Sequence, residues 1–152
     1  NDAIACAQAG ATAVHVHCRN PKDGHPSSDP EVIRQIVTRI KEGCDVVVGI
    51  STGGGPGMAP EDRLRGAATC QPELASFNLG SMNFSMHRVA RRYKPEDWKF
   101  DWEEGYVDGT KDFIFRNTFG DMEIFARTMK EKIPHSVVTP DRMPVSPSRT
   151  IP

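Results

Sequence analysis

Two histidines separated by one residue, His15 and His17, are the side chains of this sequence best suited to metal chemistry. They alternate with Val14 and Val16, and an apolar residue at every second position is typical of a β-strand. Residues i and i+2 of a strand point to the same side, so both imidazoles can reach one ion. Two neutral imidazoles supply half of a tetrahedral zinc shell, which a catalytic site completes with a third protein ligand and a water. The alternative is that both are polar residues on the solvent side of a half-exposed strand.

The residues around this pair predict that it lies at the carboxyl end of its strand. Residues 9–13, AGATA, lead in without charge, as a buried strand does. Residues 18–21, CRNP, then end the strand directly after His17. Parallel α/β folds bind their ligands at the carboxyl ends of their strands. The H-x-H motif therefore predicts a metal site at such an edge.

Polar or glycine-rich segments follow two further predicted strands. The strand over residues 45–50, DVVVGI, continues into residues 51–57, STGGGPG, where glycines let a ligand approach backbone N–H groups and the hydroxyls add donors. The same glycines can serve steric needs alone, and the segment matches neither Walker A nor G-x-G-x-x-G. In the strand predicted over residues 73–79, Ser76 and Asn78 share one face near the end. Their alternative role is that of buried polar groups satisfied by the backbone.

Alternating strands and helices are predicted to position these segments. The strands begin about 30 residues apart, which is the spacing of βα units with right-handed crossovers. This pattern is typical of half a barrel or of half a doubly wound sheet. The predicted strands occupy residues 13–18, 45–50 and 73–79, and the predicted helices occupy residues 2–8, 30–43 and 60–69 and a segment after Thr118. The predicted apolar stripes are Val32, Ile33, Ile36, Val37 and Ile40 in one helix, and Met122, Phe125, Ala126 and Met129 in another.

Composition places the chain among soluble globular proteins. It has 152 residues, of which 38% are hydrophobic and 26% charged, and its formal net charge is −1. The interspersed charges argue against a nucleic-acid partner or a polybasic membrane surface, and no apolar run approaches the roughly 20 residues that span a bilayer. The four cysteines lie far apart without a C-x-x-C pair, so we expect reduced thiols and a cytoplasmic protein.

Two loop segments complete the described pattern. Residues 20–28, NPKDGHPSS, form a loop in which His25 is either a further ligand or, by preference, a solvated histidine. Residues 86–111 are rich in charged and aromatic side chains, some of which alternate: Trp98, Phe100 and Trp102. We expect these aromatic rings to pack a loop over the mouth of the barrel or to pack against a partner subunit.

With these motifs in place, the sequence resembles the β-keto acid cleavage enzymes. The matching segments are AGATAVHVHCRNPKDGHPSSD, DVVVGISTGGG, PELASFNLGSMNF, KFDWEEGY and IFRNTFGDME, in family order over residues 3–132. The resemblance implies a (β/α)8 TIM barrel that binds one zinc through the H-x-H motif and a distal glutamate. It also implies the condensation of a β-keto acid with acetyl-CoA, which gives acetoacetate and a new acyl-CoA.

The resemblance also implies roles for particular residues. His15 and His17 would bind zinc, and four residues would hold the carboxylate of the keto acid and its neighbouring atoms: Ser51, Gly54, Ser76 and Asn78. The arginine and aspartate that flank the distal glutamate in the family have no counterpart here, so no catalytic acid or base is assigned in this chain. The implied partners are the two small substrates and, in the full-length protein, further copies in a homo-oligomer.

Some features depart from the family pattern. Asn20 stands where the family has aspartate, the first barrel strand would precede Asn1, and the sequence from Ile133 does not resemble the fifth strand. We therefore expect an amino-terminal fragment, inactive alone and prone to associate. It would consist of a partial TIM-barrel domain over residues 1–132 and a proline-rich, poorly ordered tail over residues 133–152.

Two other functions fit parts of the pattern. Metal-dependent hydrolases of the amidohydrolase type also place H-x-H at the end of a barrel strand, but they need further histidines on later strands. The two later candidates, His87 and His135, lie in no strand-like context. The third possibility is a truncated product without catalytic activity whose exposed surfaces only associate.

Overall fold

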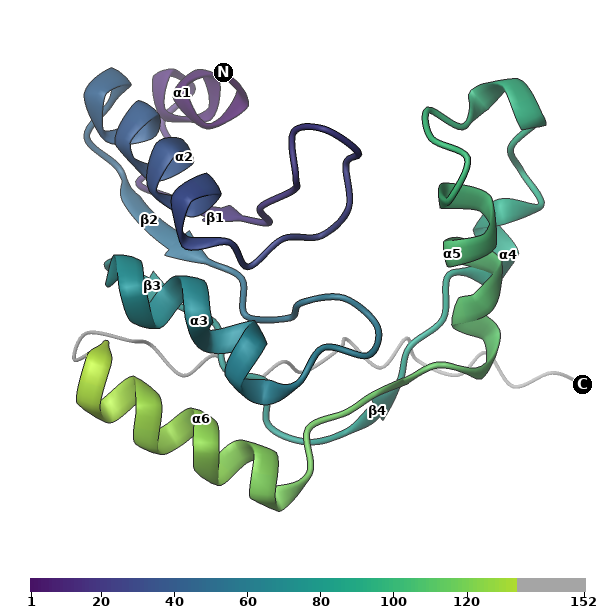
Figure 1. The fold of residues 1–152 in the computed structure, drawn as a ribbon. Coiled ribbons are helices and arrows are strands. Elements are labelled where there is room, and N and C mark those ends of the chain that lie inside the picture. Colours follow the sequence, from purple (N-terminus) through teal and green to yellow (C-terminus); the bar gives the residue numbers. More distant parts are fainter. Residues whose placement is uncertain (134–152) are drawn as a thin grey trace, which may run out of the picture.

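Three parallel strands form the sheet that carries the predicted site. The computed structural model describes residues 1–133. The strands β1 (Ala13–Val16), β2 (Val47–Ile50) and β3 (Leu74–Ala75) lie side by side in the order β1-β2-β3, and both pairings are parallel (Figure 1). This confirms the α/β class and the parallel sheet. Closure into a TIM barrel stays a prediction.

The strands are shorter than the sequence pattern predicts. The difference is largest at β3, where the predicted length of residues 73–79 is wrong and the strand covers only Leu74–Ala75. Side chains replace main-chain partners at both of its ends. The carboxylate of Glu73 accepts a hydrogen bond from Val48 N at 2.9 Å, and the hydroxyl of Ser76 accepts one from Thr52 N at 2.9 Å. Regular pairing therefore stops at Ala75, although Ser76 N still donates to Ile50 O at 3.1 Å.

Helices pack beside the strands as the sequence predicts. The helices are α1 (Asp2–Gln8), α2 (Pro30–Gly43), α3 (Pro60–Cys70) and α6 (Phe119–Lys132). Side chains cap two of these helices, since Asp29 accepts a hydrogen bond from Glu31 N and Thr118 forms a capping box with Asp121. Within residues 1–133 no helix is both long and apolar enough to span a bilayer.

The core consists of two apolar clusters. One joins the sheet to α2, and its buried members are Cys18, Ile33, Ile40, Val46, Val48 and Ile50. The other joins α3 to α6, and its buried members are Leu64, Ala67, Ala75, Phe77, Phe125, Met129 and Ile133. The predicted stripe of α6 is correct for Phe125 and Met129 but wrong for Ala126, which is exposed; Ile124 packs against the cluster instead. Ile133 is 1% exposed, and the rest of the predicted tail, residues 134–152, lies outside the described residues.

A long excursion separates β3 from α6, and we call residues 82–115 the arm. Its base is an antiparallel pair, β4 (Met82–Asn83) with β5 (Ile114–Phe115), in which Met82 opposes Phe115. Beyond this pair lie α4 (His87–Ala90), η1 (Pro95–Asp97), α5 (Glu103–Gly109) and η2 (Thr110–Asp112). Figure 1 shows α4 and α5 standing apart from α2 and α3, with the loop between β1 and α2 reaching towards them.

Two helical glycines provide a matched test of this packing. An ideal Cβ on Gly66 of α3 would overlap Ile33 Cδ1 of α2 and lie 2.9 Å from Ser28 O, whereas one on Gly105 of α5 meets nothing within 4 Å. We predict that Gly66→Ala lowers the free energy of unfolding by about 1–3 kcal/mol through overpacking. Gly105→Ala should instead raise it by about 0.5–1 kcal/mol, since alanine favours the helix. Urea unfolding followed by circular dichroism measures both, and a stabilising Gly66→Ala would contradict the α2–α3 packing.

Candidate metal and substrate site

The carboxyl ends of the three strands bring the predicted site residues to one edge of the sheet. His15 lies on β1 and His17 directly beyond its end, Ser51 follows β2, and Ser76 and Asn78 follow β3. Because the pairing is parallel, these ends face the same way. This is the edge at which open α/β sheets and barrels place their ligands.

The two imidazoles lie next to each other. Their ring centroids are 5.1 Å apart and the ring planes are inclined by 80°, and both residues are exposed. The i, i+2 spacing predicts this proximity, which the structure confirms. The role of the pair as metal ligands stays a prediction.

Gly49 of β2 makes room for His15, and the sequence analysis did not identify it. The two residues oppose each other in the parallel pair, and an ideal Cβ on Gly49 would lie 3.4 Å from His15 Nδ1 and 3.4 Å from Leu74 Cβ. A β-branched side chain at this position would therefore press on the imidazole. Its only sequence signal is a glycine inside a strand, which often marks a close approach.

The residues present fit part of a zinc shell. Nitrogen ligands suit zinc, and two imidazoles held side by side can supply two of its usual four. Within residues 1–133 no group of three or more His, Cys, Asp or Glu side chains gathers as a metal site. His25 does not join the pair; its ring stacks on Trp102 of the arm instead.

Hydroxyl groups fix the glycine-rich turn, residues 51–57, which follows β2 and lies beside the end of β3. Thr52 is completely buried, its N–H donates to Ser76 Oγ at 2.9 Å and its hydroxyl donates to Ser76 O at 2.7 Å. Ser51 Oγ accepts a hydrogen bond from Gly53 N at 3.2 Å. The hydroxyls of Ser51 and Ser76 therefore shape the glycine-rich turn, which is the structural alternative to ligand binding. Asn78 is 7% exposed beyond the end of β3.

Gly54 requires glycine for two reasons. Its φ of +65° is a left-handed conformation, and an ideal Cβ there would lie 2.7 Å from Arg63 Cγ and 3.1 Å from Met58 Sδ. The turn therefore passes directly over the side chain of Arg63. Any larger residue at position 54 would move the backbone away from α3.

Arg63 is the polar residue that fastens this site, and the sequence analysis missed it. Its guanidinium donates from Nε to Thr52 O at 2.9 Å, from Nη1 to Arg116 O at 3.0 Å and from Nη2 to Asn117 Oδ1 at 2.9 Å. The guanidinium carbon also lies over the rings of Phe115 and Phe125, 5.1 and 4.7 Å from their centroids. Arg63 is only 5% exposed, and burial lowers the pKa of its guanidinium.

A second arginine pairs with a buried carboxylate at the start of α6. Arg116 donates from Nε and Nη2 to the two oxygens of Asp121, at 2.8 and 2.7 Å. These hydrogen bonds, together with one from Thr118 N, hold the pKa of Asp121 well below its ordinary value. A cleft of about 320 Å³ lies beside this pair, between the glycine-rich turn and β5, and neither His15 nor His17 lines it.

The three hydrogen bonds of Arg63 can be tested against an exposed arginine of the same helix. We predict that Arg63→Lys lowers the free energy of unfolding by about 1–3 kcal/mol, because an ammonium cannot serve three divergent oxygens and leaves buried acceptors unpaired. Arg65 is exposed on α3, so Arg65→Lys should change the free energy by less than about 0.5 kcal/mol. Equal urea midpoints for the two variants would contradict the fastening role of Arg63.

The paired carboxylate predicts a pH dependence of stability. Because folding lowers the pKa of Asp121, this group stabilises the fold at neutral pH, and its contribution falls as the pH drops below the unfolded value of about 4. We expect Asp121→Asn to be less stable than the parent at pH 7, with the difference shrinking at pH values below about 4. Urea midpoints measured across this range test the prediction, and a constant difference would contradict it.

Comparisons with known proteins match the part of the chain that contains the sheet and the site residues. A family model described as beta-keto acid cleavage enzyme matches residues 1–137. The 3,5-dioxohexanoate:acetyl-CoA acetone transferase of Paraburkholderia graminis is 45% identical over 121 residues, which cover 80% of this chain and 38% of that protein. The 3-keto-5-aminohexanoate cleavage enzyme of Acetoanaerobium sticklandii is 42% identical over 77 residues, 50% of this chain and 28% of that protein. A 3-dehydrocarnitine:acetyl-CoA trimethylamine transferase of Rhizobium meliloti is 32% identical over 104 residues, 55% of this chain and 35% of that protein. The chain thus spans 28–38% of the length of these relatives.

Proposed function

This chain belongs to the beta-keto acid cleavage enzyme family, and on that basis we propose that the protein condenses a β-keto acid with acetyl-CoA. The relatives named as acetyl-CoA transferases support the co-substrate. The observation that carries the proposal is the pair of adjacent imidazoles, with centroids 5.1 Å apart, at the carboxyl edge of the parallel sheet. Family membership also favours this reaction over amidohydrolase chemistry.

The reaction exchanges acyl groups without an oxidant or reductant. The bond between the keto carbon and the CH2 group next to the carboxylate breaks, and that CH2 group forms a new bond to the acetyl carbon. The keto acyl group leaves on the thiolate of coenzyme A, so the products are acetoacetate and a new acyl-CoA.

We infer that zinc is held by His15 and His17, and as a Lewis acid it would stabilise the charge that develops on the keto oxygen. Two imidazoles leave half of a tetrahedral shell open, so a further protein ligand would come from outside residues 1–133. The catalytic acid and base would likewise come from outside residues 1–133. We therefore infer that residues 1–133 alone do not complete the site.

The substrate carboxylate is assigned to the glycine-rich turn. Ser51 supplies a hydroxyl, and Gly54 lets the backbone approach a ligand closely, while Arg63 fixes the turn from beneath. Ser76 and Asn78, at the neighbouring strand end, would hold the atoms next to the carboxylate. A carboxylate held in this way orients the ketone towards the imidazole pair, and orientation of this kind contributes substantially to rate.

The histidine pair is the direct test of the proposed function. In the full-length protein we predict that His15→Ala and His17→Ala each lower kcat/KM by more than about 100-fold, which exceeds the effect typical of residues that only support a metal ligand. An acetoacetate assay with bound zinc measured in parallel provides the readout. His87→Ala is the control and should keep near-parental activity, since His87 lies on α4 of the arm and contacts Ser85. Near-parental activity of either variant after chelation and dialysis would contradict the metal role.

A further inference from the structure

The segment that follows His17 is a closed hairpin loop, residues 18–27. Ser27 N donates to Cys18 O at 2.9 Å and Asn20 N donates to His25 O at 2.8 Å, and an isolated antiparallel bridge joins Arg19 to Pro26. The backbone of the loop is thus tied to the residue directly after the second histidine. A displacement of the loop would therefore reach His17 through its neighbour Cys18.

The tip of this hairpin loop is held by the arm. Trp102 Nε1 donates to Asp23 O at 2.8 Å, and the imidazole of His25 stacks on the Trp102 ring with centroids 3.9 Å apart and planes inclined by 20°. Between them, Gly24 has φ +72° and lies so close to Phe100 that an ideal Cβ would overlap its ring. Three consecutive residues of the tip therefore contact two aromatic residues of the arm.

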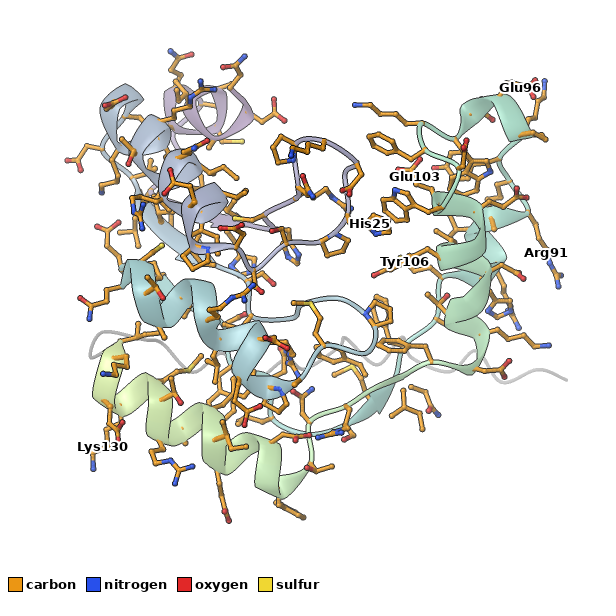
Figure 2. The ribbon with its side chains drawn as sticks, in the orientation of Figure 1. His25, Arg91, Glu96, Glu103, Tyr106 and Lys130 are labelled. Carbon is orange, nitrogen blue, oxygen red and sulfur yellow. The ribbon has the colours of Figure 1, made fainter. Side chains whose placement is uncertain are left out.

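These contacts join parts of the chain that are otherwise well separated. The Trp102–Asp23 hydrogen bond spans 79 residues, and the arm leaves the body through β4 and returns through β5. In Figure 2, His25 points from the hairpin loop towards α5, and Tyr106 points back from α5 towards the body. Trp102 and Tyr106 also pack edge to face, with ring centroids 5.4 Å apart. The Trp102 ring that holds the tip of the hairpin loop is therefore itself packed against α5.

From these contacts we propose that Trp102 is a positioning residue for His17. By clamping the tip of the hairpin loop, Trp102 fixes the backbone beyond β1 and so holds the second imidazole in place beside the first. The proposal rests on the proposed function, in which both imidazoles bind zinc. His15 needs no such support from the loop, because it lies within β1 opposite Gly49.

Trp98 offers a matched control on the same arm. Its ring packs against that of Tyr93 in a tilted arrangement, with centroids 5.2 Å apart and planes inclined by 47°. Its buried Nε1 has no hydrogen-bond partner among the described residues. Trp98→Phe therefore makes the same substitution as Trp102→Phe, but at a tryptophan that packs on Tyr93 and not on the hairpin loop. Trp102→Phe removes the donor but keeps a ring for His25 to stack on, and Trp102→Ala removes both.

The first experiment measures Zn2+ affinity of the full-length protein by competition with a chelator, and the visible absorption of its Co2+-substituted form. We expect Trp102→Ala to weaken zinc affinity about 10–100-fold, which is the range for residues that orient metal ligands, with a smaller loss for Trp102→Phe. The Co2+ spectrum should change in the same order, while Trp98→Phe should match the parent in both readouts. Parental zinc affinity and an unchanged Co2+ spectrum in a folded Trp102→Ala protein would overturn the proposal.

The second experiment needs no metal and separates this proposal from the proposed function. Lys22 is exposed in the hairpin loop, so trypsin cleavage after it reports how often the loop opens. We expect cleavage to become about 5–10-fold faster in Trp102→Ala, as for the loss of one hydrogen bond with its stacking contact, and to stay unchanged in Trp98→Phe. A parent protein that binds no zinc but shows this pattern would refute the metal role and keep the clamp. Equal cleavage rates in Trp102→Ala and the parent would refute the clamp.

Discussion

The buried guanidinium of Arg63 is the interaction on which the arrangement of the site depends. It reaches from α3 to the carbonyl of Thr52 in the glycine-rich turn and to the segment that follows β5, at Arg116 and Asn117. A buried charge is costly unless its donors are satisfied, and here three oxygens and two aromatic faces surround it. The side chain of Arg63 therefore links the turn that carries Ser51 and Gly54 to the segment that follows β5.

Side chains complete the hydrogen bonding of the sheet at both ends of β3. Glu73 and Ser76 accept hydrogen bonds from the backbone of β2 and of the turn after it, at places where a longer strand would present carbonyl groups. Alternation in sequence predicts that a strand is present and which face its residues share, and β3 does lie where it was expected. It does not predict where side chains take over from the backbone, so the strand lengths were wrong.

The predictable part of the site is the part encoded by local spacing. His15 and His17 follow from an i, i+2 rule, and the helix caps at Asp29 and Thr118 follow from residue type and position. Arg63 has no such signal, because an arginine in the first turns of a helix is usually solvated and only the tertiary structure shows that this one is buried. Trp98, Phe100 and Trp102 were expected to pack a loop over the mouth of the barrel or to pack against a partner subunit, and both stay predictions. In the structure Phe100 and Trp102 contact the tip of the loop over residues 18–27, whereas Trp98 packs against Tyr93.

The two histidines are held in place by different means. His15 is a paired residue inside β1, whereas the pairing of β1 with β2 ends at Val16, whose carbonyl accepts a hydrogen bond from Ser51 N at 3.0 Å. His17 lies beyond this main-chain contact with Ser51, between the end of β1 and the hairpin loop over residues 18–27. A strand fixes a side chain more precisely than a loop does. The precision of the distance between the two imidazoles therefore depends on the contacts that hold His17. In this chain that support comes from the sheet on one side and from a long-range aromatic contact on the other.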